Sequence, residues 1–267
     1  MNKKPMQFSA NFKNNIEHKT KFCAVAFDLD GTLYPNYRFY TQLIPFLLKE
    51  AKYLRAFGKA RDRIRRESEE QREERKEKRE KRTSSLITYH LSLLPPTCSF
   101  YQRQAHYMAE ILGKDPAFLE ERTEKIIYRG WEPLFKKVRL FPYVKEILGA
   151  FREKGLKLGL LSDFPPEAKI DCLGLSGYLD VLLSSERTGR LKPDPLPFLE
   201  LSRVLDLSPE DILYVGNSYS YDILGAQRAG MKAAWIIPRR KYHHAKKKEK
   251  ADFVFYDYRQ LLDFVLF

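Results

Sequence analysis

Apolar runs and amphipathic segments alternate along the chain from residue 139 onward, and this alternation restricts the fold more than any other feature. The apolar runs predict strands at residues 156–162, 180–185, 211–218 and 232–237, and residues 251–267 combine a strand with a helix. The segments between them have helical spacing, at residues 142–155, 165–174, 195–206 and 221–230. Strands that alternate with helices predict an α/β fold, a Rossmann-like parallel sheet with helices on both faces.

Polar side chains follow the strands of this predicted sheet. An earlier apolar run at residues 21–27 predicts one more buried strand, and "DLDGT" comes directly after it. In an open α/β sheet the residues that follow the strands gather at one edge, where ligands bind. The candidates at this edge are Asp28, Asp30, Ser162, Lys192, Asn217 and Asp222. Carboxylate and amide oxygens suit a hard divalent cation, and an ammonium with a hydroxyl suits a phosphate.

Asp28 and Asp30 are separated by one residue, so their side chains are expected to reach the same volume along an extended segment. Two neighbouring carboxylates repel each other unless a cation lies beside them. Gly31 allows the backbone to turn sharply next to a ligand. One carboxylate can then attack phosphorus while the other carries a proton to the leaving oxygen. Taken alone, this tetrapeptide could equally be an ordinary turn.

Four short segments resemble the motifs of phosphatases in the haloacid dehalogenase superfamily. In chain order they are "FDLDGTLYP", Ser162 within "LLSDF", Lys192 within "LKPDP", and "VGNSYSYD". The resemblance extends from about residue 21 to the end of the chain. The roughly 100 residues between the first and second motifs resemble the helical cap that one branch of the superfamily carries at this position.

The resemblance implies a role for each matching residue. Asp28 would form an aspartyl-phosphate, and Asp30 would protonate the leaving alcohol and then activate water. Thr32 and Ser162 would hydrogen-bond the transferring phosphoryl group, and Lys192 would neutralise its charge. The activity implied is hydrolysis of a small phosphorylated metabolite, such as a sugar phosphate, phosphoglycolate or a nucleoside monophosphate.

The resemblance also implies a Mg²⁺ cofactor. Its ligands would be Asp28, the backbone carbonyl of Asp30, and the fourth motif through Asn217 and Asp222. Most relatives have an aspartate where this chain has Asn217, and an asparagine oxygen can bind Mg²⁺ but contributes no charge. Metal affinity is therefore expected to fall. Asp222 is expected to act as an outer or water-mediated ligand, and on its own it could instead be the N-cap of a helix.

The predicted organisation has a core, an insertion and a leader. Residues 1–20 form a polar leader, and residues 21–37 and 139–267 form the α/β core. Residues 38–138 show helical spacing without a clear strand and form the predicted α-helical cap, which includes a charged helix at 59–82.

The net charge of +13 is concentrated in three segments, residues 1–22, 59–82 and 239–250. Ile64 is the only apolar residue between positions 61 and 82, where acidic and basic residues alternate at i,i+4 spacing. These mixed signs favour a solvated helix over a nucleic-acid-binding arm. The basic loop 239–250 could contact nucleic acid, but a nucleic-acid partner is not the favoured prediction.

Composition excludes several classes of protein. No apolar run approaches the roughly 18 residues that a membrane span requires, and the basic N-terminus lacks the apolar segment of a secretory signal. Cys23, Cys98 and Cys172 are far apart and odd in number, so they predict neither a disulfide framework nor a zinc site. A reducing, cytoplasmic location is expected.

Two alternatives to the phosphatase hypothesis stay open on the sequence. A protein of the same fold with little turnover could bind nucleic acid or a protein partner, as Asn217 and the basic segments suggest. A mutase-type phosphotransferase is the other, although no residue indicates its acceptor. Hydrolysis of phosphate esters with and without Mg²⁺ distinguishes the leading hypothesis from the first alternative.

Overall fold

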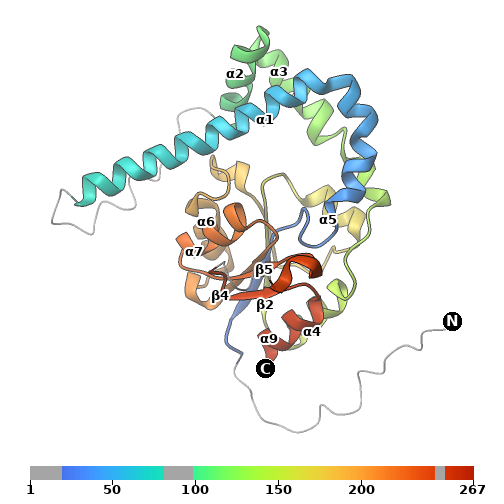
Figure 1. The fold of residues 1–267 in the computed structure, drawn as a ribbon, viewed down its shortest axis with the longest axis vertical. Coiled ribbons are helices and arrows are strands. Elements are labelled where there is room, and N and C mark those ends of the chain that lie inside the picture. The colour runs from blue at the N-terminus through green and yellow to red at the C-terminus, as the bar shows by residue number, and fades with distance from the viewer. Residues whose placement is uncertain (1–19, 81–98, 244–249) are drawn as a thin grey trace.

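The computed structural model describes residues 20–80, 99–243 and 250–267 (Figure 1). The polar leader predicted at residues 1–20 lies outside this description except for its last residue. Residues 81–98 of the predicted cap and residues 244–249 of the basic loop also lie outside it.

A six-stranded, all-parallel β-sheet forms the centre of the molecule, with the strand order β3-β2-β1-β4-β5-β6. The strands are β1 Ala24–Phe27, β2 Lys157–Ser162, β3 Val181–Ser184, β4 Ile212–Gly216, β5 Lys232–Ile236 and β6 Phe253–Phe255. These strands confirm the predicted α/β class. The strand order reverses beside β1, and such a switch point opens a crevice at the carboxyl ends of the neighbouring strands.

Helices cover both faces of the sheet because both faces are apolar. Val25 and Phe27 of β1 point into one layer, and Ala24 and Ala26 point into the other, all fully buried. The first layer contains α4 Val144–Glu153 and α9 Tyr258–Leu266, and the second contains α6 Pro195–Leu205 and α7 Leu224–Arg228. This three-layer core buries the central strands β1 and β4 completely and leaves the strand ends as the accessible polar edge.

The chain between β1 and α4 forms a helical insertion, residues 36–137 as far as they are described. Its helices are α1 Asn36–Glu80, α2 Phe100–Leu112 and α3 Pro116–Thr123, followed by a π-helical turn at Glu124–Tyr128 and a 3-10 helix at Glu132–Lys137. Ser99 and Asp115 begin α2 and α3 as N-caps. In Figure 1, α1 crosses above the sheet, with α2 and α3 beside it.

The charged part of α1 is helical as far as it is described, to residue 80, but one face of it is buried against the core. Arg61, Ile64 and Ser68 are no more than 4% exposed. Ile64 packs with Leu191, and Ser68 Oγ accepts a hydrogen bond from Arg190 Nη1 at 3.0 Å. The expectation of a solvated helix is therefore wrong for this face, because polar groups of the core satisfy its polar side chains. The opposite face does carry exposed charges, among them Asp62, Arg66 and Glu70.

Two of the three cysteines, Cys23 and Cys172, are free thiols, and Cys98 lies outside the described residues. In the described ranges, no helix combines the length and the apolar character needed to cross a bilayer.

Candidate active site

A lysine and two carboxylates meet at the carboxyl edge of the sheet. Asp28 directly follows β1, Asp222 lies in the π-helical turn after β4, and Lys192 precedes α6. Lys192 Nζ lies 2.7 Å from Asp28 Oδ1 and 2.7 Å from Asp222 Oδ1. All three side chains are buried. The fold thus brings together three candidates that the sequence distributes over widely separated loops.

The remaining oxygens of the two carboxylates are also bound. Asp28 Oδ2 accepts a hydrogen bond from Thr32 Oγ1 at 2.8 Å, and Asp222 Oδ2 accepts one from the Ser218 backbone N–H at 2.9 Å. A Cβ atom at Gly216 would clash with the Asp222 side chain, so the end of β4 requires a glycine. Ser218, and not Asp222, is the N-cap of the turn. The N-cap alternative for Asp222 is therefore wrong.

Burial sets the electrostatics of this cluster. The pKa of Asp28 is raised from 3.8 to about 7: burial raises it most, the Lys192 ammonium opposes this, and the charges of Asp222 and Asp30 add to it. Burial alone would lower the pKa of Lys192, but Asp222 and Asp28 hold it well above its ordinary value. Lys192 therefore stays charged. Because two carboxylates share one ammonium, an additional cation would be stabilised here.

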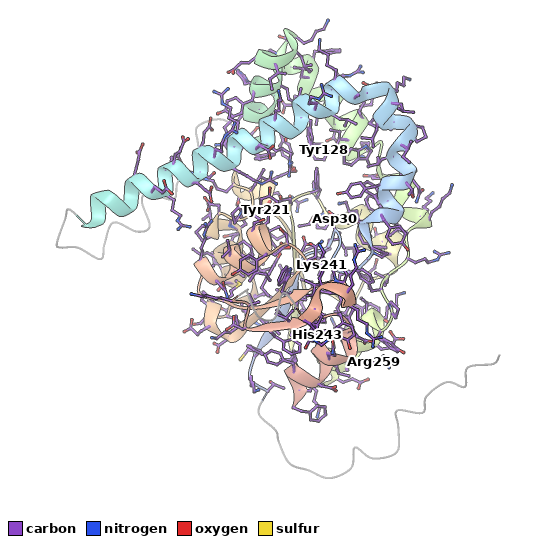
Figure 2. The ribbon with its side chains drawn as sticks, viewed as in Figure 1. Asp30, Tyr128, Tyr221, Lys241, His243 and Arg259 are labelled. Carbon is purple, nitrogen blue, oxygen red and sulfur yellow. The ribbon has the colours of Figure 1, made fainter. Side chains whose placement is uncertain are left out.

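Asp30 binds a different set of partners. Lys169 Nζ, on α5 Glu167–Leu173, lies 2.9 Å from Asp30 Oδ1 and 2.7 Å from Asp30 Oδ2. The Tyr34 hydroxyl donates to Asp30 Oδ1, and Ser162 Oγ lies 3.5 Å from Asp30 Oδ2. Figure 2 shows Asp30 at the edge of the core that faces the helical insertion. The two aspartates of the first motif thus have separate cations.

The turn of the first motif lies against Asn217. Gly31 has a φ of 90°, and a Cβ there would clash with the side-chain amides of Asn217 and Asn36. Asn36 Nδ2 donates to the backbone carbonyl of Asp30 at 3.3 Å. The backbone carbonyl of Asn217 accepts from Trp235 Nε1 at 2.9 Å, which fixes this loop beside the turn. Glycine is required at position 31 both for its φ and for this close approach.

The oxygen atoms near this turn fit a hard divalent cation. They belong to the carboxylates of Asp28 and Asp222, the backbone carbonyl of Asp30 and the amide of Asn217. Among the described residues, no three His, Cys, Asp or Glu side chains form a cluster suited to a metal ion. An amide and a backbone carbonyl would complete the ligand set, so the donors present fit Mg²⁺ with less negative charge than three carboxylates would supply.

Three residues at this edge were not predicted as functional: Lys169, Asp163 and Tyr214. Tyr214 Oη donates to the Leu161 carbonyl at 3.0 Å and lies 3.3 Å from Lys192 Nζ. Asp163 directly follows Ser162, and its position after a strand could have identified it as a further residue of this edge. Nothing in the helical spacing around Lys169 separates it from a surface lysine, because its partner Asp30 comes from a distant segment.

Comparison with known proteins gives concordant results. A family model described as haloacid dehalogenase-like hydrolase matches residues 23–230. Glyceraldehyde 3-phosphate phosphatase of Methanopyrus kandleri is 28% identical over 248 residues, which cover 91% of this chain and 96% of that relative. Phosphoglycolate phosphatase of Salmonella paratyphi A is 30% identical over 181 residues, which cover 64% of this chain and 71% of that relative.

A solved structure supports the fold. The 2-haloacid dehalogenase from Pseudomonas syringae superimposes with a TM-score of 0.55 over 91% of this chain and 97% of its own, at 22% sequence identity. The family model spans most of the chain and includes all four motif segments. The chain therefore belongs to the haloacid dehalogenase-like hydrolase family.

Proposed function

We propose that this protein is a Mg²⁺-dependent phosphatase that hydrolyses a small phosphomonoester through an aspartyl-phosphate at Asp28. The observation that carries the proposal is the buried convergence of Asp28, Lys192 and Asp222, joined by 2.7 Å ion pairs. Both curated relatives described above are named as phosphatases of small phosphorylated compounds, which supports a substrate of this class.

In the first step, a carboxylate oxygen of Asp28 attacks phosphorus, and the bond between phosphorus and the alcohol oxygen breaks. Asp30 gives a proton to that oxygen, so the product leaves as a neutral alcohol. Lys192 and Thr32 both contact Asp28 and can therefore contact a phosphoryl group bound next to it. Ser162, close to Asp30, would add a third donor to the phosphoryl oxygens.

In the second step, water attacks phosphorus, and Asp30 takes its proton. Phosphate leaves and the Asp28 carboxylate is regenerated. Lys169 and Tyr34 hold the Asp30 carboxylate in place for both proton transfers. Mg²⁺, bound by Asp28, the Asp30 carbonyl, Asn217 and Asp222, would neutralise charge on the phosphoryl group. The helical insertion would act as the cap that covers the substrate and excludes water.

The dehalogenase reaction is a weaker candidate, because halide and alcohol leaving groups differ in their need for a proton. A halide is a weak base and leaves without protonation, whereas an alkoxide requires an acid. Asp30 is two residues from Asp28 and is held by Lys169 and Tyr34, so it is placed to carry a proton to such an oxygen. A second carboxyl group at this position therefore has a role in phosphate ester hydrolysis that carbon–halogen cleavage does not require.

The direct test is the substitution Asp28→Asn, assayed on p-nitrophenyl phosphate with and without Mg²⁺. We expect turnover to fall at least about 10³-fold, because an amide cannot serve as the nucleophile. Asp206→Asn is the matched control: Asp206 is exposed, has a φ of 54° that asparagine tolerates, and lies at the end of α6. Activity that survives in Asp28→Asn at the control level would refute the nucleophile assignment.

Two arginines of the charged helix argue against the alternative of a nucleic-acid-binding module. Arg61 and Arg65 are engaged by the acidic side chains of Glu186 and Asp163 in the core. These two arginines are therefore not available to bind the phosphate groups of a nucleic acid.

A further inference from the structure

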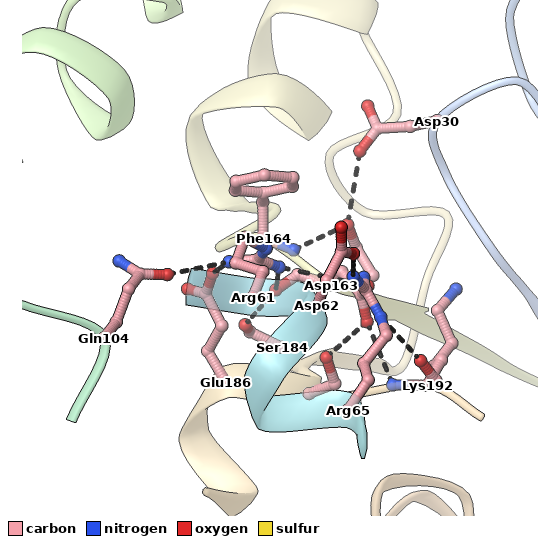
Figure 3. Close-up of polar contacts among 12 residues, drawn as sticks. Asp30, Arg61, Asp62, Arg65, Gln104, Asp163, Phe164, Ser184, Glu186 and Lys192 are labelled. Carbon is pink, nitrogen blue, oxygen red and sulfur yellow. Dashed lines mark hydrogen bonds and ion pairs between the residues drawn. The ribbon is translucent and has the colours of Figure 1, made fainter. Parts of the chain in front are cut away.

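One arginine of the helical insertion contacts three loops of the candidate active site. Arg65 lies in the charged part of α1, and its side chain is 17% exposed. Its Nη2 atom lies 2.7 Å from Asp163 Oδ2, and its Nε atom donates to the Lys192 carbonyl at 3.1 Å. Its guanidinium lies 4.7 Å from the ring centre of Tyr221. Figure 3 shows Arg65 reaching from the helix to Asp163 and Lys192.

These contacts adjoin three of the four motif segments. Asp163 follows Ser162, the Lys192 carbonyl belongs to the residue that binds Asp28, and Tyr221 precedes Asp222. A planar guanidinium can hold several partners at fixed angles, which a lysine in its place could not do. Arg65 therefore joins loops that follow different strands, at the point where their side chains would surround a phosphoryl group.

Asp163 links these loops from within. Its Oδ1 atom accepts hydrogen bonds from Ser185 Oγ at 2.6 Å and from the Lys192 backbone N–H at 3.3 Å, while Oδ2 binds Arg65. Burial alone would raise the pKa of Asp163, but Arg65, Lys192 and Arg61 lower it to about 2. The carboxylate is therefore a permanent anion between Ser162 and Lys192, and it needs its cations to remain buried.

We propose that Arg65 is a positioning residue of this hydrolase, which through Asp163 aligns Ser162 and Lys192 for phosphate binding when α1 is docked on the core. The inference rests on the proposed phosphatase function, because it assigns phosphate binding to this site. It explains why a helix that is almost entirely charged carries one face that fits the core. Docking of the insertion and assembly of the phosphate site are then a single event.

The main experiment compares Arg65→Met with Arg66→Met. Arg66 is the next residue on the same helix and is exposed, so it controls for lost charge and altered helix propensity. For each protein, the dissociation constant of inorganic phosphate is measured by calorimetry with Mg²⁺, and kcat and KM are measured on p-nitrophenyl phosphate. Arg65→Met should weaken phosphate binding and raise KM about 10- to 100-fold, whereas Arg66→Met should change neither.

A purely structural ion pair gives a different pattern. It would lower the thermal midpoint of Arg65→Met and leave the phosphate dissociation constant unchanged at temperatures where the protein is folded, and that result overturns the proposal. Arg65→Lys keeps the positive charge but lacks the planar guanidinium with its several donors, so only partial recovery of phosphate affinity is expected. Equal losses of phosphate affinity in Arg65→Met and Arg66→Met would also overturn the proposal.

A double-mutant cycle tests the route through Asp163. If Arg65 acts through Asp163, the double variant Arg65→Met/Asp163→Asn should bind phosphate at least as tightly as the single variant with the lower phosphate affinity. If the double variant instead loses phosphate affinity by the product of the two single losses, the two residues act independently and the route through Asp163 is contradicted.

The proposed function and this inference can fail separately. If the wild-type protein binds phosphate but hydrolyses no phosphate ester, the phosphatase assignment fails while the comparison of dissociation constants still decides the role of Arg65. If the wild-type protein hydrolyses phosphate esters but binds no inorganic phosphate, the inference about Arg65 is overturned while the phosphatase assignment stands.

Discussion

At the scale of single residues, three carboxylates of the site share two ammonium groups. Lys192 forms ion pairs with both Asp28 and Asp222, and Lys169 forms one with Asp30. A buried carboxylate that lacks a full counter-charge favours its protonated form, and this is why the pKa of Asp28 is raised to about 7. A further cation beside Asp28 would therefore favour its ionised, nucleophilic form.

The raised pKa of Asp28 predicts how stability depends on pH without metal. Between pH 4 and pH 7 the folded protein holds a proton on Asp28 that the unfolded chain, with its pKa near 3.8, has lost. The free energy of unfolding should therefore decrease as pH rises through this range, by at most about 4 kcal/mol for this group. Urea denaturation in EDTA at pH 5, 6 and 7 measures this slope.

Asp28→Asn is the control for this slope, because an amide does not titrate. The variant should lose the part of the decrease that Asp28 contributes, and its curve should be flatter than that of the wild-type protein. Parallel curves for the two proteins would mean that Asp28 is already ionised in the folded state near pH 5.

At the scale of elements, α1 shows how a charged helix can be part of a core. Its buried face carries Ile64, flanked by the polar side chains of Arg61 and Ser68, which find partners on the core. The apolar content of this stretch is far too low to predict burial from periodicity. Hydrogen bonds and ion pairs to groups such as Glu186 and Arg190 complete the interface.

The docking of α1 predicts unequal costs for two isoleucine-to-alanine substitutions, one on each side of the kink that α1 makes at Glu50. Ile64→Ala should lower the free energy of unfolding by about 2–5 kcal/mol, because Ile64 is fully buried against Leu191. Ile44→Ala should change it by no more than about 0.5 kcal/mol, because Ile44 is 52% exposed. Urea denaturation of both variants gives the comparison, and equal values would mean that α1 is not docked in solution.

At the scale of the whole molecule, the site lies where separate parts of the chain meet. Asp28 comes from the centre of the sheet, Asp222 follows the neighbouring strand β4, and the helical insertion supplies Arg65. A cation bound by the loops after β1 and β4 would connect two strands that the sequence separates widely, so metal binding should stabilise the entire fold.

Mg²⁺ should therefore raise the free energy of unfolding. At a concentration 100-fold above its dissociation constant, the gain is about 2.7 kcal/mol if the unfolded chain does not bind the metal. Denaturation with MgCl₂, compared with NaCl at equal ionic strength, measures the gain, and EDTA should abolish it. The gain should shrink in Asp28→Asn; an equal gain in that variant would place the stabilising metal elsewhere.

Much of the fold was predictable because its signals are local. Apolar runs of strand length, separated by amphipathic segments, predicted the five strands after the insertion, and the run at residues 21–27 contains β1. The motif segments predicted that Asp28, Lys192 and Asp222 would lie together, and the sheet places them together. These predictions held because parallel strands must bring their carboxyl ends to one edge.

The sequence by itself determined the order of strands and helices, and which polar residues follow the strands, since both depend on neighbours along the chain. The tertiary structure alone decided that Lys169 pairs with Asp30 and that Arg65 meets Asp163. Such pairs join segments far apart in the chain, and a charged residue looks the same in sequence whether its partner is water or a buried carboxylate. Only packing, by removing water from one face of a helix and not from the other, distinguishes the two.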